Sequence, residues 1–579
     1  MTDSLPQHFQ NSLAGRSRKN LTQHWPLWVA LAALWISTGI LQYLAARRTA
    51  GHLIYTLDDA YIHMAMAKNL ARHGVYGVTQ FEFSSSSSSP IWTLLLAGFY
   101  VLFGVHESFP FILDLLVSSF ILVAAYTFLN GKVRSRIVTM LTLLGIVFFT
   151  PLPLLISTGM EHPLQILFCI VFLWLSATMI ADETFARKPS NIVYVLLLCA
   201  ALVLTRFESY ALVFTTCLLF ALRGRWRIAL GVAVASILPL LVYQAISVAH
   251  GWRWLPNSIL VRASAKGEGM FNSMESVVVL PWKSPDFYKI GWNALHGAPY
   301  LVVLVGVSLF LLAISWSSSR QLWKREHMLL IAYVAAVLAH VQFGRIGFFF
   351  RYDAYLISMG IFVVPFASVG LFDELKRWMT RGRLRAAAGG FMLLFALQLP
   401  VPLLIRTFLA FPLIPLASQN IYEQQYQMGL FLHRYYSGRT IAANDIGAIS
   451  FLADIHLVDL VGLASADIYH LKEEHEFNTA RVLQLCDERN VCIAVAYEYW
   501  LEDGGLTGFQ ERWKKVGGWK IQHDVVCGSN VVSFFAVQPS AKRELIENLR
   551  SFSKTLPADV DHWLTFDALS DSSRLRTKP

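Results

Sequence analysis

Long apolar runs separated by short polar connections dominate the chain as far as residue 411. Most approach the roughly 20 residues that an α-helix needs to cross a bilayer. The predicted spans are residues 25–46, 110–129, 137–156, 163–181, 191–205, 209–222, 228–249, 299–316, 327–343, 355–372 and 386–411. A further apolar run, 91–105, is shorter. The pattern predicts a polytopic α-helical membrane protein with about eleven transmembrane helices.

The remaining sequence has a different pattern. Short β-branched or apolar runs at 440–444, 491–497 and 531–537 predict strands, and 478–490 has helical spacing. We therefore expect a small α/β domain over 412–538, followed by a loosely ordered tail over 539–579 with a helix at 544–549. The serine run 84–89 is low in complexity, which predicts a flexible loop.

Composition supports a membrane protein. Hydrophobic residues make up 55% of the 579 residues and charged residues only 15%, where a soluble protein carries about 25% charged residues. The mean hydropathy is +0.48. These values exclude an ordinary soluble enzyme and a disordered chain. The net charge of +10 comes from short basic clusters between spans, so it indicates topology and not nucleic-acid binding.

The basic clusters predict the orientation. They crowd the connections at 132–136, 187–188, 223–227, 320–325 and 376–385, which alternate with connections that carry few basic residues. These connections and the segment 1–24 should be cytoplasmic. All five share one side only if the run 91–105 lies in the membrane interface without crossing. The C-terminal domain then lies outside the cytoplasm, on a protein of the inner (plasma) membrane.

Polar residues that topology does not require collect in the outward connections. The candidate site residues are Asp58, Asp59, Glu161, Arg206, Glu208, Asn257, Arg351 and Tyr352. Ionisable groups at membrane depth are costly unless they are paired or face a water-filled cavity. Any one of them alone is as well explained by an interfacial anchor or a salt bridge, but their gathering on one side indicates a site.

The pair Asp58-Asp59 is the sharpest candidate. Neighbouring carboxylates repel, and a carboxylate with a raised pKa suits a general base. The alternative is an ordinary helix N-cap. His63 lies four residues beyond Asp59 on the same predicted helix face. Two ligands are too few to predict a metal site, so no metal ligand is assigned, although a divalent metal remains possible.

Several segments resemble the bacterial GT-C glycosyltransferases, in the order and spacing of that superfamily. LDDAYIHMAMAKNLARHGVYG with SSPIWTLLLAG is similar to its first outer loop, and STGMEHPLQ to its Gly-Met-Glu loop. LTRFESYALV resembles its Thr-Arg-Pro-Glu-Gly element, with Phe207 and Ser209 at the usual Pro and Gly positions. WLPNSILVRAS, FRYDAYL and IAANDIGAISFL resemble its Pro-Asn-Thr element, its late Arg-Tyr element and the start of its soluble domain.

The resemblance implies a reaction. GT-C enzymes transfer a sugar, with inversion, from a polyprenyl phosphate on the outer leaflet to an acceptor, and an Asp of the first outer loop (here 47–109) is the base. We therefore expect Asp58 or Asp59 as base, with Asp58 slightly favoured. Arg351 and Arg206 are candidate phosphate partners. Glu161 and Glu208 would bind sugar hydroxyls or hold Arg206, and Asn257 and Tyr352 complete the substrate residues.

Other possibilities remain at this stage. A transporter or flippase of a polyprenyl-linked sugar would also carry polar residues near the membrane, and a non-catalytic scaffold could bind envelope glycan. Three acceptor classes stay open, namely a glycan, a lipid and a protein. For Arg351, a pair with Asp353 or another loop carboxylate is the alternative to phosphate. Three cysteines in the C-terminal domain suggest a bridge between Cys527 and either Cys486 or Cys492.

Overall fold

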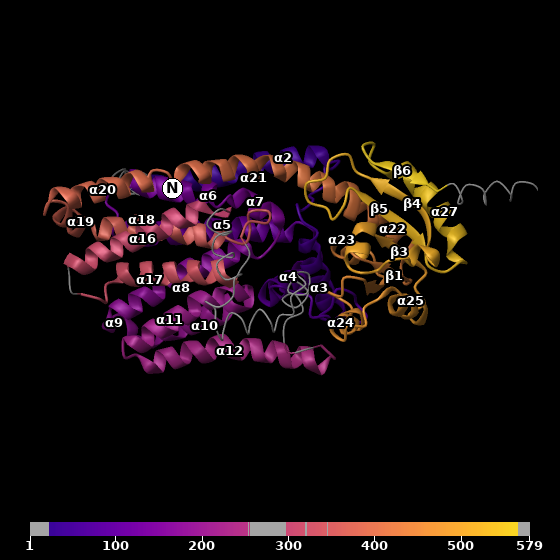
Figure 1. Ribbon diagram of the computed structural model, residues 1–579, viewed down its shortest axis with the longest axis horizontal. Helices are drawn as coiled ribbons and strands as arrows, with labels where there is room; N and C mark the ends of the chain where they lie inside the picture. The colour runs from indigo at the N-terminus through magenta and orange to yellow at the C-terminus, as the bar shows by residue number, and fades with distance from the viewer. Residues whose placement is uncertain (1–22, 253, 255–296, 319–320, 344–345, 566–579) are drawn as a thin grey trace, which may run out of the picture.

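The computed structural model describes residues 23–252, 254, 297–318, 321–343 and 346–565. Most of the predicted N-terminal segment, the large loop with Asn257, and the end of the tail lie outside these ranges. The described part consists of a body of long helices with a sheet domain at one end (Figure 1).

Helices occupy all the predicted spans that the structure describes. The body contains α2 (Trp25–Arg48), α3 (Asp59–His73), α4 (Pro90–Phe103), α5 (Phe109–Asn130), α6 (Arg136–Phe149), α7 (Leu152–Thr158), α8 (His162–Ala181), α9 (Glu183–Ala186), α10 (Pro189–Thr205), η1 (Phe207–Ser209), α11 (Tyr210–Leu222), α12 (Trp226–Ala249), α16 (Pro299–Ser318), α17 (Arg325–Phe343), α18 (Ala354–Gly370), α19 (Phe372–Met379), α20 (Arg383–Ala396) and α21 (Pro400–Ile421). Among the described residues, seven helices are long and apolar enough to cross a membrane, or eight if the bent pair α18–α19 is one span. The helices α4, α10 and α11 are shorter apolar ones. The number of crossings therefore stays a prediction.

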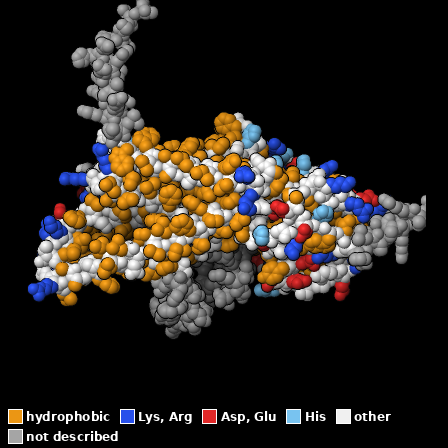
Figure 2. All heavy atoms as spheres, turned by 90° about the horizontal axis from the view of Figure 1, so that it is seen from above, with side chains coloured by type: hydrophobic (Ala, Val, Ile, Leu, Met, Phe, Trp, Pro, Cys, Tyr) orange, Lys and Arg blue, Asp and Glu red, His pale blue; other side chains and the backbone are white. Residues whose placement is uncertain are grey.

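Apolar side chains cover most of the face of the helical body seen in Figure 2. Phe214 is 71% exposed on α11 and Phe408 73% exposed on α21. Charged side chains instead gather on the sheet domain and at the opposite end of the body. An apolar surface of this extent is suited to lipid and not to water.

The basic connections meet at the end of the body that lies away from the sheet. Lys132 pairs with Glu326 at 2.7 Å, and Lys324 pairs with Glu374 at 2.5 Å. The Arg223 guanidinium lies 5.2 Å from the Trp323 ring centroid. These contacts join four of the five predicted cytoplasmic connections, so their grouping on one side of the body is confirmed.

The sheet domain has six strands in the order β2-β1-β3-β5-β4-β6. Its elements are α22 (Gln427–Tyr436), β1 (Thr440–Ala443), α23 (Gly447–Leu452), β2 (His456–Asp459), α24 (Ala466–Glu473), α25 (Thr479–Glu488), β3 (Ile493–Ala496), α26 (Glu498–Asp503), η4 (Phe509–Glu511), β4 (Lys514–Lys520), β5 (Val531–Ala536), α27 (Ala541–Phe552), η5 (Ser553–Thr555) and β6 (Asp561–Leu564). β1 pairs in parallel with β2 and β3, whereas β5 pairs antiparallel with β3 and β4. The predicted α/β domain is confirmed, and the three predicted strands are β1, β3 and β5.

Both predicted boundaries of this domain need correction. The helix α21 runs past residue 412 and continues through a π-helical turn (η3, Tyr422–Tyr426) into α22. At the other end, β6 pairs with β4, and Leu545 and Phe552 of α27 are buried in the core below the sheet. The predicted loose tail is therefore part of the domain as far as Leu564, because its apolar residues complete the core.

The predicted disulfide is wrong. All six cysteines are free thiols. The Cys527 thiol donates to the Gln425 side-chain oxygen at 3.4 Å, and the Cys492 thiol donates to the Thr440 carbonyl oxygen at 3.3 Å.

Candidate active site

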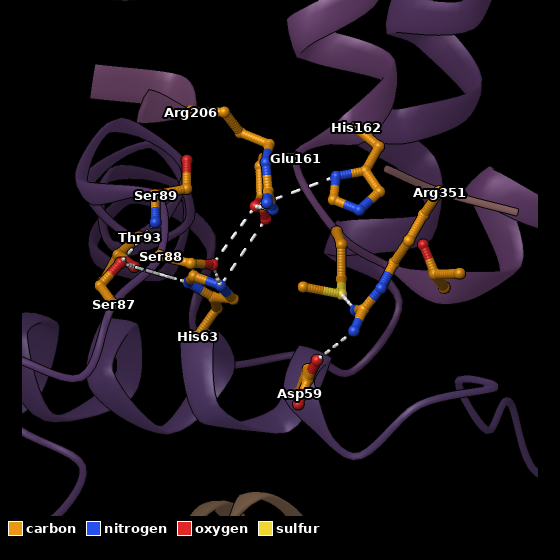
Figure 3. A network of polar contacts seen from close by, with 12 residues as sticks. Asp59, His63, Ser87, Ser88, Ser89, Thr93, Glu161, His162, Arg206 and Arg351 are labelled. Carbon is orange, nitrogen blue, oxygen red and sulfur yellow. Dashed lines mark hydrogen bonds and ion pairs between the residues drawn. The ribbon is translucent and has the colours of Figure 1, made fainter. Parts of the chain in front are cut away.

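The candidate site lies at the junction of the helical body and the sheet domain, where α3 begins. α3 carries Asp59 and His63, the loop before α8 carries Glu161, and the loop before α18 carries Arg351 (Figure 3). Six of the predicted site residues are thus brought into one network: Asp59, Glu161, Arg206, Glu208, Arg351 and Tyr352. Asn257 lies outside the described residues.

Asp58 is locked in place. Its carboxylate accepts hydrogen bonds from the backbone N–H of Gly447 at 2.6 Å and of Ala448 at 2.8 Å. It therefore meets the beginning of α23 and makes no side-chain cap on its own helix α3. The predicted alternative, an ordinary N-cap of its own helix, is therefore wrong, because the carboxylate binds the first N–H groups of α23 in the other domain. A Cβ at Gly447 would lie 2.1 Å from the Asp58 carbonyl oxygen, so only glycine fits there.

A second buried carboxyl faces Asp58. Burial raises the pKa of Asp58 well above its usual range, and the neighbouring Asp445 raises it further. Burial also raises the pKa of Asp445, which accepts hydrogen bonds from Gln425 at 2.8 Å and from the Tyr497 hydroxyl at 3.1 Å. We therefore expect the two carboxyls to share a proton, because two buried negative charges in contact would repel strongly.

Asp59 differs from Asp58 in its exposure and in its partners. Its side chain is 43% exposed, and it pairs with Arg351 at 2.8 Å. Arg351 is buried and also donates to the Met160 sulfur at 2.8 Å and to the Tyr352 hydroxyl at 3.3 Å. Its Nε–H has no hydrogen-bond partner among the described residues. Of the predicted carboxylate partners of Arg351, Asp353 is not the one used, and another loop carboxylate, Asp59, takes that place.

Asp353 is instead held by a residue that the sequence prediction missed. Arg406 of α21 donates to the Asp353 carboxylate at 2.9 Å and to the Phe350 carbonyl oxygen at 2.6 Å. Phe348, Phe349 and Phe350 have φ of 30°, 54° and 60°, a region that is costly for L residues. These bonds help to hold the loop that presents Arg351. The signal was available, since an arginine inside a predicted span is seldom without a role.

Arg206 is bound by two carboxylates. It donates to Glu161 at 2.8 Å and to both oxygens of Glu208 at 3.1 and 2.6 Å. Of the two roles expected for Glu161 and Glu208, the structure thus supports holding Arg206. The Tyr352 ring lies between the two site arginines, 5.4 Å from the Arg206 guanidinium and 5.0 Å from that of Arg351.

His63 and the serine run complete the network. His63 lies 3.0 Å from the Thr93 hydroxyl and 3.3 Å from that of Ser88, and 3.6 Å from Glu161. Ser88 also donates to Glu161 at 3.3 Å. Burial lowers the pKa of His63. The predicted flexible loop at 84–89 is wrong, because Ser84, Ser85, Ser86, Ser87 and Ser89 are buried.

Metal binding has no support in the observed clusters. Among the residues that the structure describes, no group of three or more His, Cys, Asp and Glu side chains is arranged to hold a metal ion.

Comparisons with known proteins place this geometry in context. A family model described as a domain of unknown function (DUF8728) matches residues 419–535. No curated protein matches the chain in sequence.

Solved structures similar to the chain include ArnT from Cupriavidus metallidurans in the apo state. That pair has 12% identity and a TM-score of 0.47 over 89% of this chain and 99% of the other. ArnT from the same organism bound to undecaprenyl phosphate has 13% identity and a TM-score of 0.48, over 88% of this chain and 99% of the other. The oligosaccharyltransferase of Archaeoglobus fulgidus in the apo form has 13% identity and a TM-score of 0.45, over 88% of this chain and 74% of the other. Both proteins are GT-C glycosyltransferases. They come from the superfamily that the sequence motifs resemble, but at this identity they transfer no residue role to this chain.

Proposed function

We propose that this protein is a membrane glycosyltransferase that moves a sugar, with inversion, from a polyprenyl phosphate to an acceptor. The reaction takes place beside the start of α3, at the end of the body that carries the sheet domain. By the predicted topology, this end is extracytoplasmic. The observation that carries the proposal is the half-exposed Asp59 carboxylate paired with the buried Arg351, whose Nε–H is unpaired among the described residues.

The chemistry assigns Asp59, and not Asp58, as the general base. The acceptor hydroxyl attacks the anomeric carbon and forms the new glycosidic bond, and its proton passes to the Asp59 carboxylate. The bond from the anomeric carbon to the phosphate oxygen breaks, and the polyprenyl phosphate leaves with that electron pair. Asp58 is a poor base because both of its oxygens already accept backbone hydrogen bonds.

Arg351 is the proposed phosphate partner. Its charge cannot be removed by deprotonation, and its free Nε–H can donate to an oxygen of the leaving phosphate. Arg206 is less suited, because three of its N–H groups donate to Glu161 and Glu208. We therefore assign Arg206 the role of positioning Glu161 and Tyr352.

The test compares Asp59→Asn with the wild type in two assays. Membranes with either protein receive radiolabelled polyprenyl-phosphate sugars from the source cells, and transfer to envelope material is measured. Purified protein is assayed for binding of undecaprenyl phosphate, the lipid named for one of the similar structures. We expect transfer to fall by at least about 100-fold while lipid binding persists.

Other outcomes would favour the alternatives. Normal transfer by Asp59→Asn would remove the base assignment. If the wild type moves the lipid-linked sugar across the vesicle membrane but transfers no sugar, the result indicates a flippase. A scaffold would show neither activity.

A further inference from the structure

A cavity of about 330 Å³ lies between the first outer loop and the sheet domain, away from the Asp59 site. Phe81 and Glu82 line it from the loop after α3, and His456 of β2 from the sheet. Asp467 of α24 and Arg489, just after α25, close it on the other side. In Figure 1, α24 and α25 lie beside β1 near α3. Its volume falls within the range of small-ligand sites, about 300–1,000 Å³.

One wall of the cavity is aromatic. The Phe81 ring stacks on the His456 ring, with centroids 3.6 Å apart and planes 17° apart. Phe81 is nevertheless 44% exposed. A face of an aromatic ring is negative and attracts positively polarised C–H groups. The C–H face of a sugar ring has the shape and polarity to pack there.

The other wall carries charged groups of both signs. Arg489 forms an ion pair with Asp467, and both charges act on Glu82. Guanidinium donates only and carboxylate accepts only, whereas a sugar hydroxyl does both. Neighbouring hydroxyls of a sugar can therefore form hydrogen bonds with both the guanidinium and the carboxylates of this wall. An acyl chain would desolvate it without replacing its hydrogen bonds, and the excess of carboxylate over cation disfavours a phosphate.

The separation between the cavity and Asp59 sets the minimum length of a ligand that reaches both. Asp59 is the first residue of α3, which has 15 residues and is therefore about 22 Å long. Phe81 follows the far end of that helix. A single sugar cannot occupy the cavity and also reach Asp59, whereas a chain of several sugars can.

We infer that the cavity lined by Phe81, Glu82, His456, Asp467 and Arg489 binds the acceptor, and that the acceptor is a glycan chain held several sugars away from its reacting end. This inference rests on the proposed function and selects one of the three acceptor classes that the sequence leaves open. The loop after α3 then has two tasks, since its serines hold His63 and its aromatic residue holds the acceptor.

The experiment uses full-length protein immobilised in nanodiscs. Envelope glycans of the source cells are partly hydrolysed to a ladder of fragments, passed over the protein, and the retained material is sized and analysed. We expect retention of oligosaccharides but not of monosaccharides. Phe81→Ala should weaken retention by about 10-fold, and Phe81→Trp should restore it. Tyr499→Ala is the control, because Tyr499 is an aromatic residue of the sheet domain that is 62% exposed and does not line the cavity.

Three results would overturn the inference. They are retention of no oligosaccharide by the wild type, equal retention by the Phe81→Ala and Tyr499→Ala variants, and retained material that is peptide or fatty-acyl lipid. Asp59→Asn separates this inference from the proposed function, since it should retain the glycan fragments but not transfer. Loss of transfer in Asp59→Asn with normal retention in Phe81→Ala would defeat the inference alone. Normal transfer in Asp59→Asn with Phe81-dependent retention would defeat the catalytic assignment alone.

Discussion

Asp58 and Asp59 are adjacent in sequence but lie in two regions that differ in how far their polar groups are satisfied. The Asp58 region is the junction between α3 and α23, where the carboxylate binds Gly447 and Ala448 at the start of α23. Lys68, further along α3, donates to the Phe451 carbonyl oxygen at 2.8 Å near the end of α23. An acid at the N-terminus and a base at the C-terminus both complement the helix dipole, so α3 clamps α23 at its two ends.

The Asp59 region is incomplete by comparison. Its carboxylate is half-exposed, and its partner Arg351 retains a buried N–H without a hydrogen-bond partner among the described residues. An unpaired buried donor costs free energy in the empty protein. Saturated hydrogen bonding thus marks the junction that holds the domains together, whereas unsatisfied groups mark the place where a ligand is expected.

The largest effect on this comparison should come from Arg351. Arg351→Ala removes a charged donor, which is worth about 1.5–3 kcal/mol, so affinity for undecaprenyl phosphate should fall at least about 10-fold and transfer should slow. Arg351→Lys keeps the charge without the planar fork and should be intermediate. Lipid titration by native mass spectrometry measures the affinity. Arg543→Ala, which removes an exposed i,i+4 pair with Glu547, is the control. Unchanged affinity in Arg351→Ala would make Arg351 a structural residue.

Asp58→Ala should damage stability instead of lipid binding. It leaves two N–H groups of α23 unpaired, and each buried unpaired donor costs about 1–3 kcal/mol. Thermal unfolding of the purified protein should show the loss, and Glu183→Ala, at an exposed ion pair, should show almost none. Wild-type stability combined with lost transfer would instead return Asp58 to the candidate bases.

The smallest expected effect is the pH dependence of stability, which tests the buried carboxyl pair Asp58 and Asp445. Since burial raises the pKa of Asp58 and Asp445 in the folded protein, the folded state binds more protons than the unfolded chain, in which Asp has a pKa of about 3.9. Their contribution to stability is therefore full below about pH 4 and is lost as the pH rises through the raised values. Unfolding midpoints measured across this range should fall with rising pH.

Asp445→Asn should flatten this dependence, because it leaves one carboxyl where two shared a proton. The lowered pKa of His63 acts in the opposite direction, since a depressed base adds stability as the pH rises, but it is common to both proteins and cancels in the difference. Identical slopes for the wild type and Asp445→Asn would argue against a shared proton.

Much of the fold could be predicted from the sequence. Hydrophobic periodicity located the long helices, because each must present an apolar surface to lipid or to its neighbours. Basic clusters predicted which connections share an end of the body. The strands β2, β4 and β6 were missed, since His456–Asp459, Lys514–Lys520 and Asp561–Leu564 contain charged, histidine or glycine residues, and only pairing with neighbours makes them strands.

The sequence by itself determined which residues gather at the site, since motif order and outward position selected Asp59, Glu161, Arg206 and Arg351 together. Because two adjacent carboxylates have the same local pattern, it favoured Asp58 over Asp59 as the base only slightly, and the proposed function reverses that choice. The proposed choice of Asp59 rests on the tertiary structure, which places the start of α23, a segment 389 residues further along the chain, against Asp58. The buried serine run and the cavity at Phe81 were decided in the same way, because burial and hydrogen-bond partners come from segments that folding brings together and that local sequence does not encode.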